Sequence, residues 1–172
     1  RVPDRLMGST LYPLNSLSQQ WPSLFAVYAE KYVGRETLMQ QTIPALGCRW
    51  NDVLHFCPVH PNLMRARLIT AGYQPKLVPW FVVDPVALDF NSNNTVIYLN
   101  RSKQYRDFTK QADDFKPFEK ASLAEFCALP QATVAYYQAT YQAGRRPLLF
   151  HHVPHVLHKG PLSTEGMTVI RA

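Results

Sequence analysis

The chain has 172 residues with 47% hydrophobic and 17% charged side chains, and its 18 Lys and Arg against 12 Asp and Glu give a net charge of +6. This composition excludes an intrinsically disordered chain, the length predicts a single domain over residues 1–172, and no apolar run is long enough to span a membrane. The excess of positive charge favours an anionic partner such as nucleic acid, a dinucleotide or an acidic surface.

In the first half of the chain, prolines and glycines separate short apolar segments. Pro22 suits the first turn of a helix, apolar side chains then recur at helical spacing, and Gly34 is a natural end. In chain order we expect a strand at 11–14, helices at 22–33 and 35–41, a loop at 43–50, a buried strand at 53–57 and a helix at 62–71.

The second half alternates strands rich in β-branched and aromatic residues with helices that begin at a polar residue or a proline. In chain order we expect strands at 77–83 and 95–99, a long loop at 101–120, helices at 122–129 and 131–143, a strand at 147–150, one helical turn at 154–158 and a strand at 167–170. Together these elements predict an α+β fold with a mixed, strongly twisted sheet.

The expected loop at 101–120 interleaves Lys and Arg with aromatic side chains, among them Tyr105 and Phe108. Aromatic rings stack on bases while cations follow the phosphates, so this composition suits single-stranded nucleic acid. The alternative is a solvated loop that its aromatic side chains pin to the core.

All six histidines fall in two short segments, 55–60 and 151–158. If the segments meet, they offer imidazole and thiolate ligands for a metal, and on a helical turn His155 and His158 would share one face. However, the spacing matches no specific zinc pattern, so we assign no metal ligand. The alternative is histidines that line a polar cleft or cap helix ends.

The three cysteines are odd in number and irregularly spaced. They form no disulfide framework, and with no signal peptide at the start we expect a cytoplasmic location. Cys57 lies close to His55 and His60, which would suit a thiolate nucleophile, but its apolar strand favours a buried, inert thiol.

The segment 48–63 has the highest density of polar groups beside apolar residues, as a ligand cleft requires. Trp50 could stack on a planar ligand, Arg49 could face a phosphate, and Asn51 or His55 could bond to a ribose or a base edge. The alternative is a structural turn whose Trp and Asn side chains satisfy backbone groups.

Within this segment, Phe56-Cys57-Pro58 followed by Pro61 and Leu63 resembles a turn motif of the DarT-type DNA ADP-ribosyltransferases. The strand at 11–14 and the 145–154 segment are similar to further features of that family in the same order. The resemblance implies an ADP-ribosyltransferase-like fold, NAD as cofactor, and transfer of ADP-ribose to a base of single-stranded nucleic acid.

The resemblance also implies roles for individual residues. Arg35 would steer the pyrophosphate or the base, and His55 would orient a ribose or act as the catalytic base. The expected cofactor-binding residues are Tyr12, Asn15, Arg49, Trp50 and Asn51.

Other functions remain open at this point. Arg146 or Pro147 stands where the family has its catalytic glutamate, and an arginine cannot accept a hydrogen bond. A divergent, non-catalytic relative is therefore one alternative. The others are a non-enzymatic binder of single-stranded nucleic acid and a metal-dependent hydrolase that uses the clustered histidines.

Overall fold

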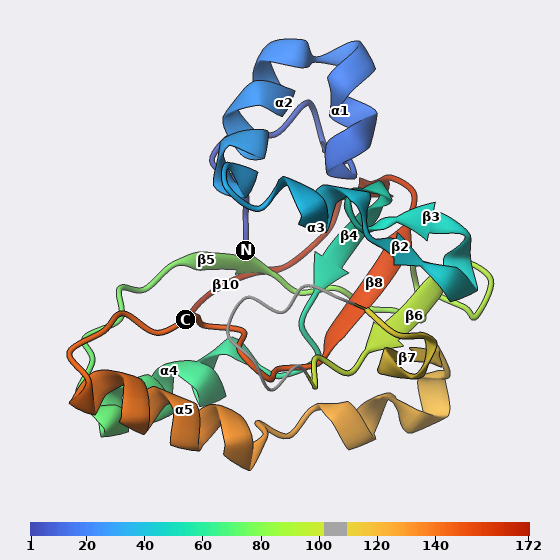
Figure 1. The fold of residues 1–172 in the computed structure, drawn as a ribbon. Helices are drawn as coiled ribbons and strands as arrows, with labels where there is room; N and C mark the ends of the chain where they lie inside the picture. The colour runs from blue at the N-terminus through green and yellow to red at the C-terminus, as the bar shows by residue number, and fades with distance from the viewer. Residues whose placement is uncertain (102–109) are drawn as a thin grey trace.

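The computed structural model describes residues 1–101 and 110–172, and a four-stranded sheet lies at its centre (Figure 1). The strand order is β4–β8–β6–β7, and every pair is antiparallel. Their bounds are β4 Val53–Phe56, β8 His155–Lys159, β6 Thr95–Tyr98 and β7 Phe115–Pro117. The register places His55 opposite Leu157 and Tyr98 opposite His155.

Alternation along these strands sends successive side chains to opposite faces of the sheet. One face carries Val53, Val96, Tyr98 and Leu157, which pack against Trp50. The other face carries a second apolar cluster, formed by Phe90, Ile97, Leu99, Phe118, Val156 and Leu162. Because β8 and β6 have neighbours on both sides, most of their side chains are buried.

Short helices and a hairpin cover the first of these faces at the N-terminal end of the molecule (Figure 1). The helices are α1 (Leu14–Gln20), α2 (Pro22–Ala29), η1 (Glu30–Tyr32) and α3 (Glu36–Gln40). The hairpin pairs β2 (Thr42–Ile43) with β3 (Cys48–Arg49) around η2 (Pro44–Leu46), and η3 (Trp50–Asp52) then leads into β4.

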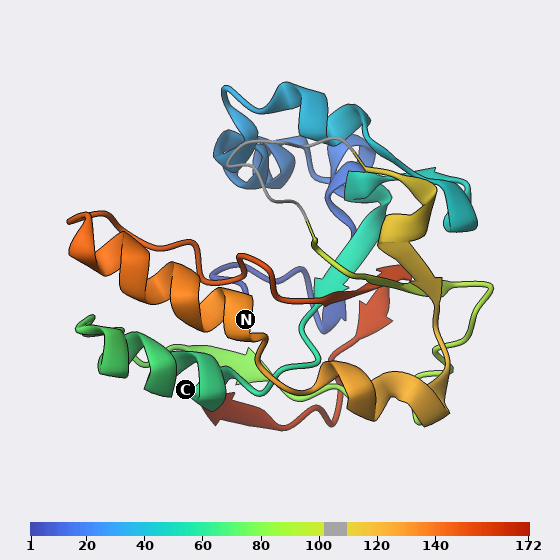
Figure 2. The ribbon, with the colours of Figure 1, turned by 60° about the horizontal axis from the view of Figure 1, so that its bottom comes forward.

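At the opposite end, α4 (Pro61–Ala71) and α5 (Gln131–Gln142) lie side by side (Figure 2). Proline occupies the first turn of α4, where no N–H partner is needed, and Gly72 ends the helix with a φ of 109°. The antiparallel ribbon of β5 (Pro79–Phe81) and β10 (Val169–Arg171) packs on α4 through a third apolar cluster around Met64 and Trp80.

The remaining elements are short and border the second face of the sheet. They are β1 (Thr10–Leu11) paired with β9 (Leu162–Ser163), η4 (Ala112–Asp114) and η5 (Lys120–Phe126). Within residues 1–101 and 110–172, every helix is too short or too polar to cross a bilayer.

The predicted α+β class is confirmed, as are the main helices and the strands that became β4, β5, β6 and β10. The predicted mixed sheet is wrong, because all strand pairs among the described residues are antiparallel. The helix expected at 122–129 is the 3₁₀ helix η5, and the loop at 43–50 contains the β2–β3 hairpin.

The two largest errors concern the segments after α5 and before α1. The expected helical turn at 154–158 is instead β8, since neighbours on both sides bury its alternating side chains. The strand expected at 147–150 is irregular chain, and the strand expected at 11–14 ends at Leu11 because Leu14 already begins α1. In the loop expected at 101–120, residues 102–109 lie outside the described residues, and 115–117 form β7.

Candidate functional site

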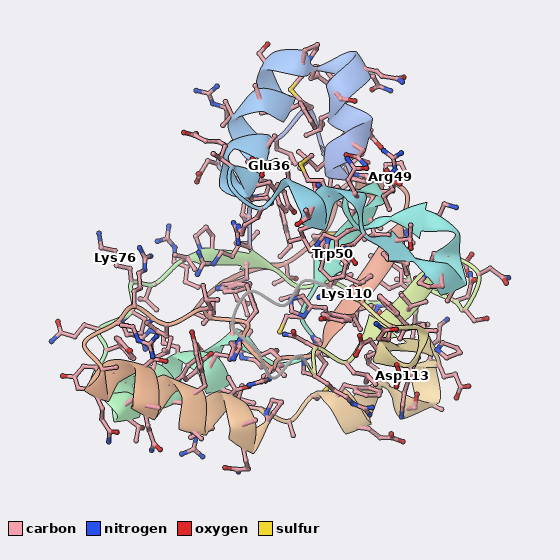
Figure 3. The ribbon with its side chains drawn as sticks, viewed as in Figure 1. Glu36, Arg49, Trp50, Lys76, Lys110 and Asp113 are labelled. Atoms are coloured by element: carbon pink, nitrogen blue, oxygen red, sulfur yellow. The ribbon has the colours of Figure 1, made fainter. Side chains whose placement is uncertain are left out.

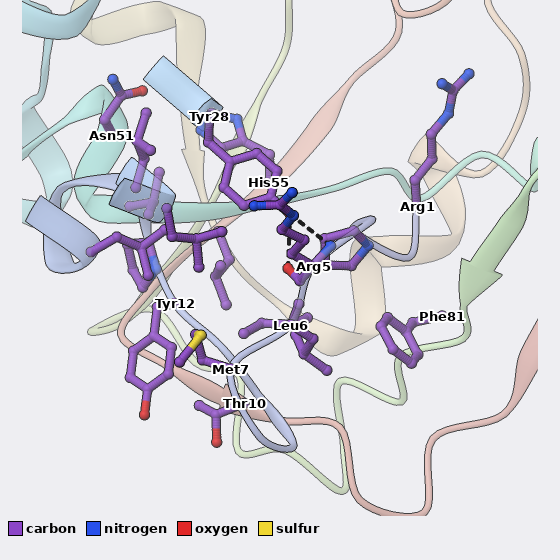
Figure 4. A pocket seen from close by; sticks show the side chains of 18 of the residues that line it. Arg1, Arg5, Leu6, Met7, Thr10, Tyr12, Tyr28, Asn51, His55 and Phe81 are labelled. Carbon is purple, nitrogen blue, oxygen red and sulfur yellow. Dashed lines mark hydrogen bonds between the residues drawn. The ribbon is translucent and has the colours of Figure 1, made fainter. Parts of the chain in front are cut away.

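Two cavities adjoin at His55 and Phe56. The first, which we call the tyrosine cavity, has a volume of about 280 Å³ and lies between the N-terminal segment, α2, η1 and β4 (Figure 4). The second, which we call the aromatic cavity, has a volume of about 480 Å³ and lies between the end of β4, β5 and the chain before β8. The linings of both include His55, Phe56, Phe81 and Val83, so a ligand with two parts has adjoining space on either side of His55.

Asn51 lines the tyrosine cavity and is the least satisfied polar side chain near it. Its side chain is 1% exposed, and neither its amide nitrogen nor its amide oxygen has a hydrogen-bond partner within residues 1–101 and 110–172. Nearly all buried polar groups in folded proteins are hydrogen-bonded, and an unpaired one costs about 1–3 kcal/mol. A buried amide beside a cavity offers a donor and an acceptor to a ligand or to water in that cavity.

A small network holds Asn51 in place. The Asn15 side chain donates a hydrogen bond of 2.7 Å to one carboxylate oxygen of Asp52, and the backbone N–H of Arg49 donates one of 2.7 Å to the other. The backbone N–H of Trp50 donates to the Gln41 carbonyl at 2.8 Å. These bonds fix the η3 turn from both sides, so the position of Asn51 is set before any ligand binds.

His55 lies in β4 at the junction of the two cavities. Its Nε2 is 3.1 Å from the carbonyl oxygen of Trp50. A carbonyl only accepts hydrogen bonds, so Nε2 carries the proton and Nδ1 keeps its lone pair. The His55 side chain is exposed by its accessible surface, and its ring lines both cavities. Desolvation by the protein around the ring, with a smaller effect from His155, lowers the pKa of His55 well below its ordinary value, and the ring is neutral at pH 7.

His155 is a second neutral imidazole on the same face of the sheet, with its ring centroid 6.4 Å from that of His55. Its Nδ1 is 2.8 Å from the Val153 carbonyl, so Nδ1 carries the proton and Nε2 is the acceptor. Burial lowers the pKa of His155 to about 4. Both rings line the aromatic cavity, which therefore has two imidazoles that are neutral at pH 7 and can accept hydrogen bonds.

In the part of the chain that the structure describes, three cationic residues and no carboxylate side chain line the tyrosine cavity. Lys31 is one of them, and partial burial with the nearby Arg35 lowers its pKa. Arg5 is held by its backbone, because the Tyr28 hydroxyl accepts from the Arg5 N–H at 3.1 Å and donates to its carbonyl at 2.8 Å (Figure 4). Cations without a neighbouring acid favour an anionic ligand.

The structure brings together three of the residues expected from the sequence, since Tyr12, Asn51 and His55 all line the tyrosine cavity. The ring of Tyr12 packs on Trp21 with 4.9 Å between centroids. Asn15 is outside this lining and acts on it through Asp52.

The remaining expected site residues lie elsewhere. Arg35 is exposed, and its guanidinium donates to the Lys31 carbonyl beside the cavity. Arg49 is exposed on the β2–β3 hairpin. Trp50 is 8% exposed, packs edge-on against His55 and Tyr98, and has the Lys110 ammonium 5.3 Å from its ring (Figure 3). The Trp50 ring therefore belongs to the core and has no open face for a planar ligand.

The two histidine segments meet only in part. His158 points to the opposite face of the sheet from His155, where it stacks on Phe90 at 4.3 Å and lies 3.0 Å from the Thr95 hydroxyl. His60 accepts a hydrogen bond from the Asn62 N–H at the start of α4. In the part of the chain that the structure describes, no three His, Cys, Asp or Glu side chains are placed to hold a metal ion.

Reasoning from the sequence assigned no site role to Arg5, Tyr28 or Lys31, and it considered His155 only as a metal ligand on a helical turn. Tyr28 and Lys31 lie in the helix expected at 22–33, where the helical spacing of apolar side chains gave no sign of a site. The one available signal for a site in this helix was the positive charge of Lys31, which lies between Tyr28 and Tyr32 in the sequence. Comparisons of the chain with protein-family models, with curated proteins and with solved structures find no match.

Proposed function

We propose that this chain binds a dinucleotide such as NAD across the two adjoining cavities and uses it to modify a base of single-stranded nucleic acid. It would then be a divergent, DarT-like member of the ADP-ribosyltransferases, with that family's fold. The observation that carries the proposal is the buried amide of Asn51, which has no partner among the described residues and lies beside a cavity that these residues line with cations and tyrosines but no carboxylate side chain.

The side chains around the tyrosine cavity suit the chemical groups of a dinucleotide. Arg5 and Lys31 would hold its pyrophosphate, because both are cationic and neither pairs with an acid among the described residues. The amide of Asn51 would bond to a ribose hydroxyl or a carboxamide, since it offers both a donor and an acceptor. Tyr12 would contribute an aromatic surface beside these groups.

When bound, NAD supplies an ADP-ribosyl group with nicotinamide as the leaving group. The role of the chain's own residues would be to bind and place the acceptor base, whose proton would pass to solvent. Nδ1 of neutral His55 can accept a hydrogen bond from an amino or amide group and so orient that base. His155 would act as a second acceptor in the adjoining cavity.

The position of the motif supports the resemblance to the DarT-type enzymes. Phe56, Cys57, Pro58 and Pro61 all line the aromatic cavity, so the turn that carries the resemblance borders the proposed site. The motif and the neutral His55 are adjacent in the chain at the end of β4.

One observation favours a second candidate, a nucleotide-binding relative without transferase activity. Among residues 1–101 and 110–172, no Asp or Glu lines either cavity, whereas the family uses a glutamate to stabilise the developing positive charge. This candidate shares the binding site with the first and lacks the chemical step.

Titration calorimetry with NAD tests the binding site common to both candidates. We expect the Asn51→Leu variant to bind roughly tenfold to a hundredfold more weakly than the unaltered chain, because it removes both ligand bonds. Asn93→Ala, in an exposed turn, is the matched control and should bind normally. No binding by the unaltered chain, or equal binding by Asn51→Leu, refutes the site.

Release of nicotinamide in the presence of single-stranded DNA or RNA separates the two candidates. Release with a mass increase of the nucleic acid, lost in His55→Gln and reduced in Arg35→Ala, supports the transferase. Binding of NAD without any release supports the non-catalytic relative.

A further inference from the structure

A third cavity lies at the far end of the molecule, between α4, the loop that follows it, β5 and the segment after α5. Its volume is about 450 Å³. Its lining includes Arg65 on α4, Lys76 in the loop after α4 and Arg146 after α5. Figure 3 places Lys76 at this end, well separated from Trp50 and Arg49. We call it the arginine cavity.

The lining of this cavity is rich in positive charge, since it also includes Arg1, and the last residue of the chain, Ala172, lies in it as well. Within residues 1–101 and 110–172, no Asp or Glu side chain is part of the lining, and Arg65, Lys76 and Arg146 pair with no Asp or Glu side chain. The Nε of Arg65 is buried and has no hydrogen-bond partner among the same residues. The nearby backbone oxygen of Ala172 already accepts from the Val78 N–H at 3.0 Å and from the Trp80 indole at 3.4 Å. Four cationic residues around one cavity, one of them with a buried guanidinium nitrogen that has no partner among the described residues, match a phosphate ligand.

Tyr73 holds the walls of the arginine cavity together. Its hydroxyl donates to the Arg145 carbonyl at 2.8 Å, and its ring packs edge-on against Tyr141 of α5 with 5.0 Å between centroids. This contact ties the loop that carries Lys76 to the segment that carries Arg146. The cations are thus held near one another before a ligand arrives, which reduces the cost of binding.

The arginine cavity adjoins the aromatic cavity, with which it shares Pro61 and Trp80. The aromatic cavity in turn shares His55 with the tyrosine cavity. The three cavities therefore adjoin one another in a row, with cationic residues in the tyrosine cavity at one end and in the arginine cavity at the other, and His55 lies between these two ends. A ligand with regularly spaced phosphates can occupy the arginine cavity while one of its bases enters the aromatic cavity.

We infer that Arg65, Lys76 and Arg146 bind backbone phosphates of a single-stranded nucleic acid and thereby direct a neighbouring base toward His55. This inference rests on the proposed function for the identity of the base-binding site. The arginine cavity itself is a separate anion site, and its test has a separate readout.

The test measures fluorescence anisotropy of a labelled single-stranded oligonucleotide over a range of salt concentrations, with the full chain. We expect Arg65→Gln, Lys76→Gln and Arg146→Gln each to weaken binding and to lower the slope of log affinity against log salt by about 0.7, and the triple variant by about 2. Arg67→Gln, an exposed cation on the same helix outside this cavity, is the matched control. Tyr73→Phe should weaken binding less than the triple variant, since it keeps every cation.

Two results would overturn the inference. One is a triple variant with the affinity and salt slope of the unaltered chain. The other is binding of inorganic phosphate or a nucleoside monophosphate as tight as that of the oligonucleotide, which would indicate a site for a free phosphate ester.

Calorimetry with NAD on the triple variant separates this inference from the proposed function. If the triple variant binds NAD normally and its affinity for the oligonucleotide is unchanged, only the inference is refuted. If the triple variant binds the oligonucleotide more weakly but the unaltered chain does not bind NAD, only the dinucleotide site is refuted.

Discussion

The side chain of Asn15 in α1 donates a 2.7 Å hydrogen bond to Asp52 at the end of the η3 turn. This bond joins the first helix to the turn that presents Asn51 to the tyrosine cavity. Neither Asn15 nor Asp52 lines that cavity. Both are therefore positioning residues, and their effect on a ligand passes through the backbone of the turn.

Asn15→Ala and Asp52→Ala test this positioning role. We expect Asn15→Ala to lower the free energy of unfolding by about 1 kcal/mol, and Asp52→Ala to lower it by more, since the carboxylate also accepts from the Arg49 N–H. Both should weaken NAD binding without changing the chemical groups of the cavity. Urea denaturation and calorimetry are the measurements, with Asn93→Ala as control. Unaltered NAD affinity in both variants would show that the turn keeps its shape without the network.

Asn51→Leu should raise the stability of the free chain. The leucine side chain has a shape similar to that of asparagine, and it removes a buried donor and a buried acceptor that have no partners among the described residues. The expected gain in the free energy of unfolding is about 1–3 kcal/mol. Urea denaturation of the two chains without ligand measures it. A loss of stability would mean that the amide is already hydrogen-bonded in the free protein, for example to water.

The free energy of unfolding should fall as the pH decreases from 7 toward 4. Burial lowers the pKa of His155 to about 4 and that of His158 below its ordinary value of 6.5, so the unfolded chain binds more protons in this window. Stability therefore increases with pH there, by up to about 1.4 kcal/mol per pH unit for each such histidine. His155→Gln should show a shallower dependence than the unaltered chain in urea denaturation at several pH values. Identical slopes would contradict the neutral state of His155.

Two glycines with positive φ offer a matched comparison at the α4–α5 end. Gly72 has a φ of +109°, and a Cβ there would overlap the ring of Tyr141, whereas Gly144 has a φ of +63° and open space. Gly144→Ala should cost about 1–2 kcal/mol from backbone strain alone. Gly72→Ala should cost more, and the Tyr141→Ala background should remove most of the excess. Thermal unfolding of the four variants measures this, and equal costs at both glycines would rule out the steric contribution of Tyr141.

Local patterns were sufficient for elements whose ends are marked by proline or glycine. Pro22 with Gly34 and Pro61 with Gly72 bounded the helical regions, and β-branched residues marked β6. The 154–158 segment failed because the same Pro-His-Val-Leu-His order fits one helical turn or one strand. Only pairing with β4 and β6 decides between them, and such long-range contacts are not visible in a single local pattern.

The candidate site was predictable only in part for the same reason. Asn51 and His55 were expected in a cleft because polar residues beside an apolar strand are unusual, and both line the tyrosine cavity. Trp50 was expected to stack on a ligand and instead packs against His55 and Tyr98, since both arrangements suit the same residue type. Lys31 and Arg5 come from separate segments, and their convergence depends on how α2 and the N-terminal segment fold over β4.

Strand β8 carries His155 on one face and His158 on the other, and it is paired along both edges. A slip of one residue would send every side chain of a strand to the opposite face. His155, which lines the cleft, and His158, which contacts Thr95 in the interior, would then both move to the opposite face of the sheet. A molecule with β8 in the wrong register would therefore lose the contact between His158 and Thr95 and, at the same time, the His155 ring beside the cleft. The correct pairing of this one strand is a condition for both.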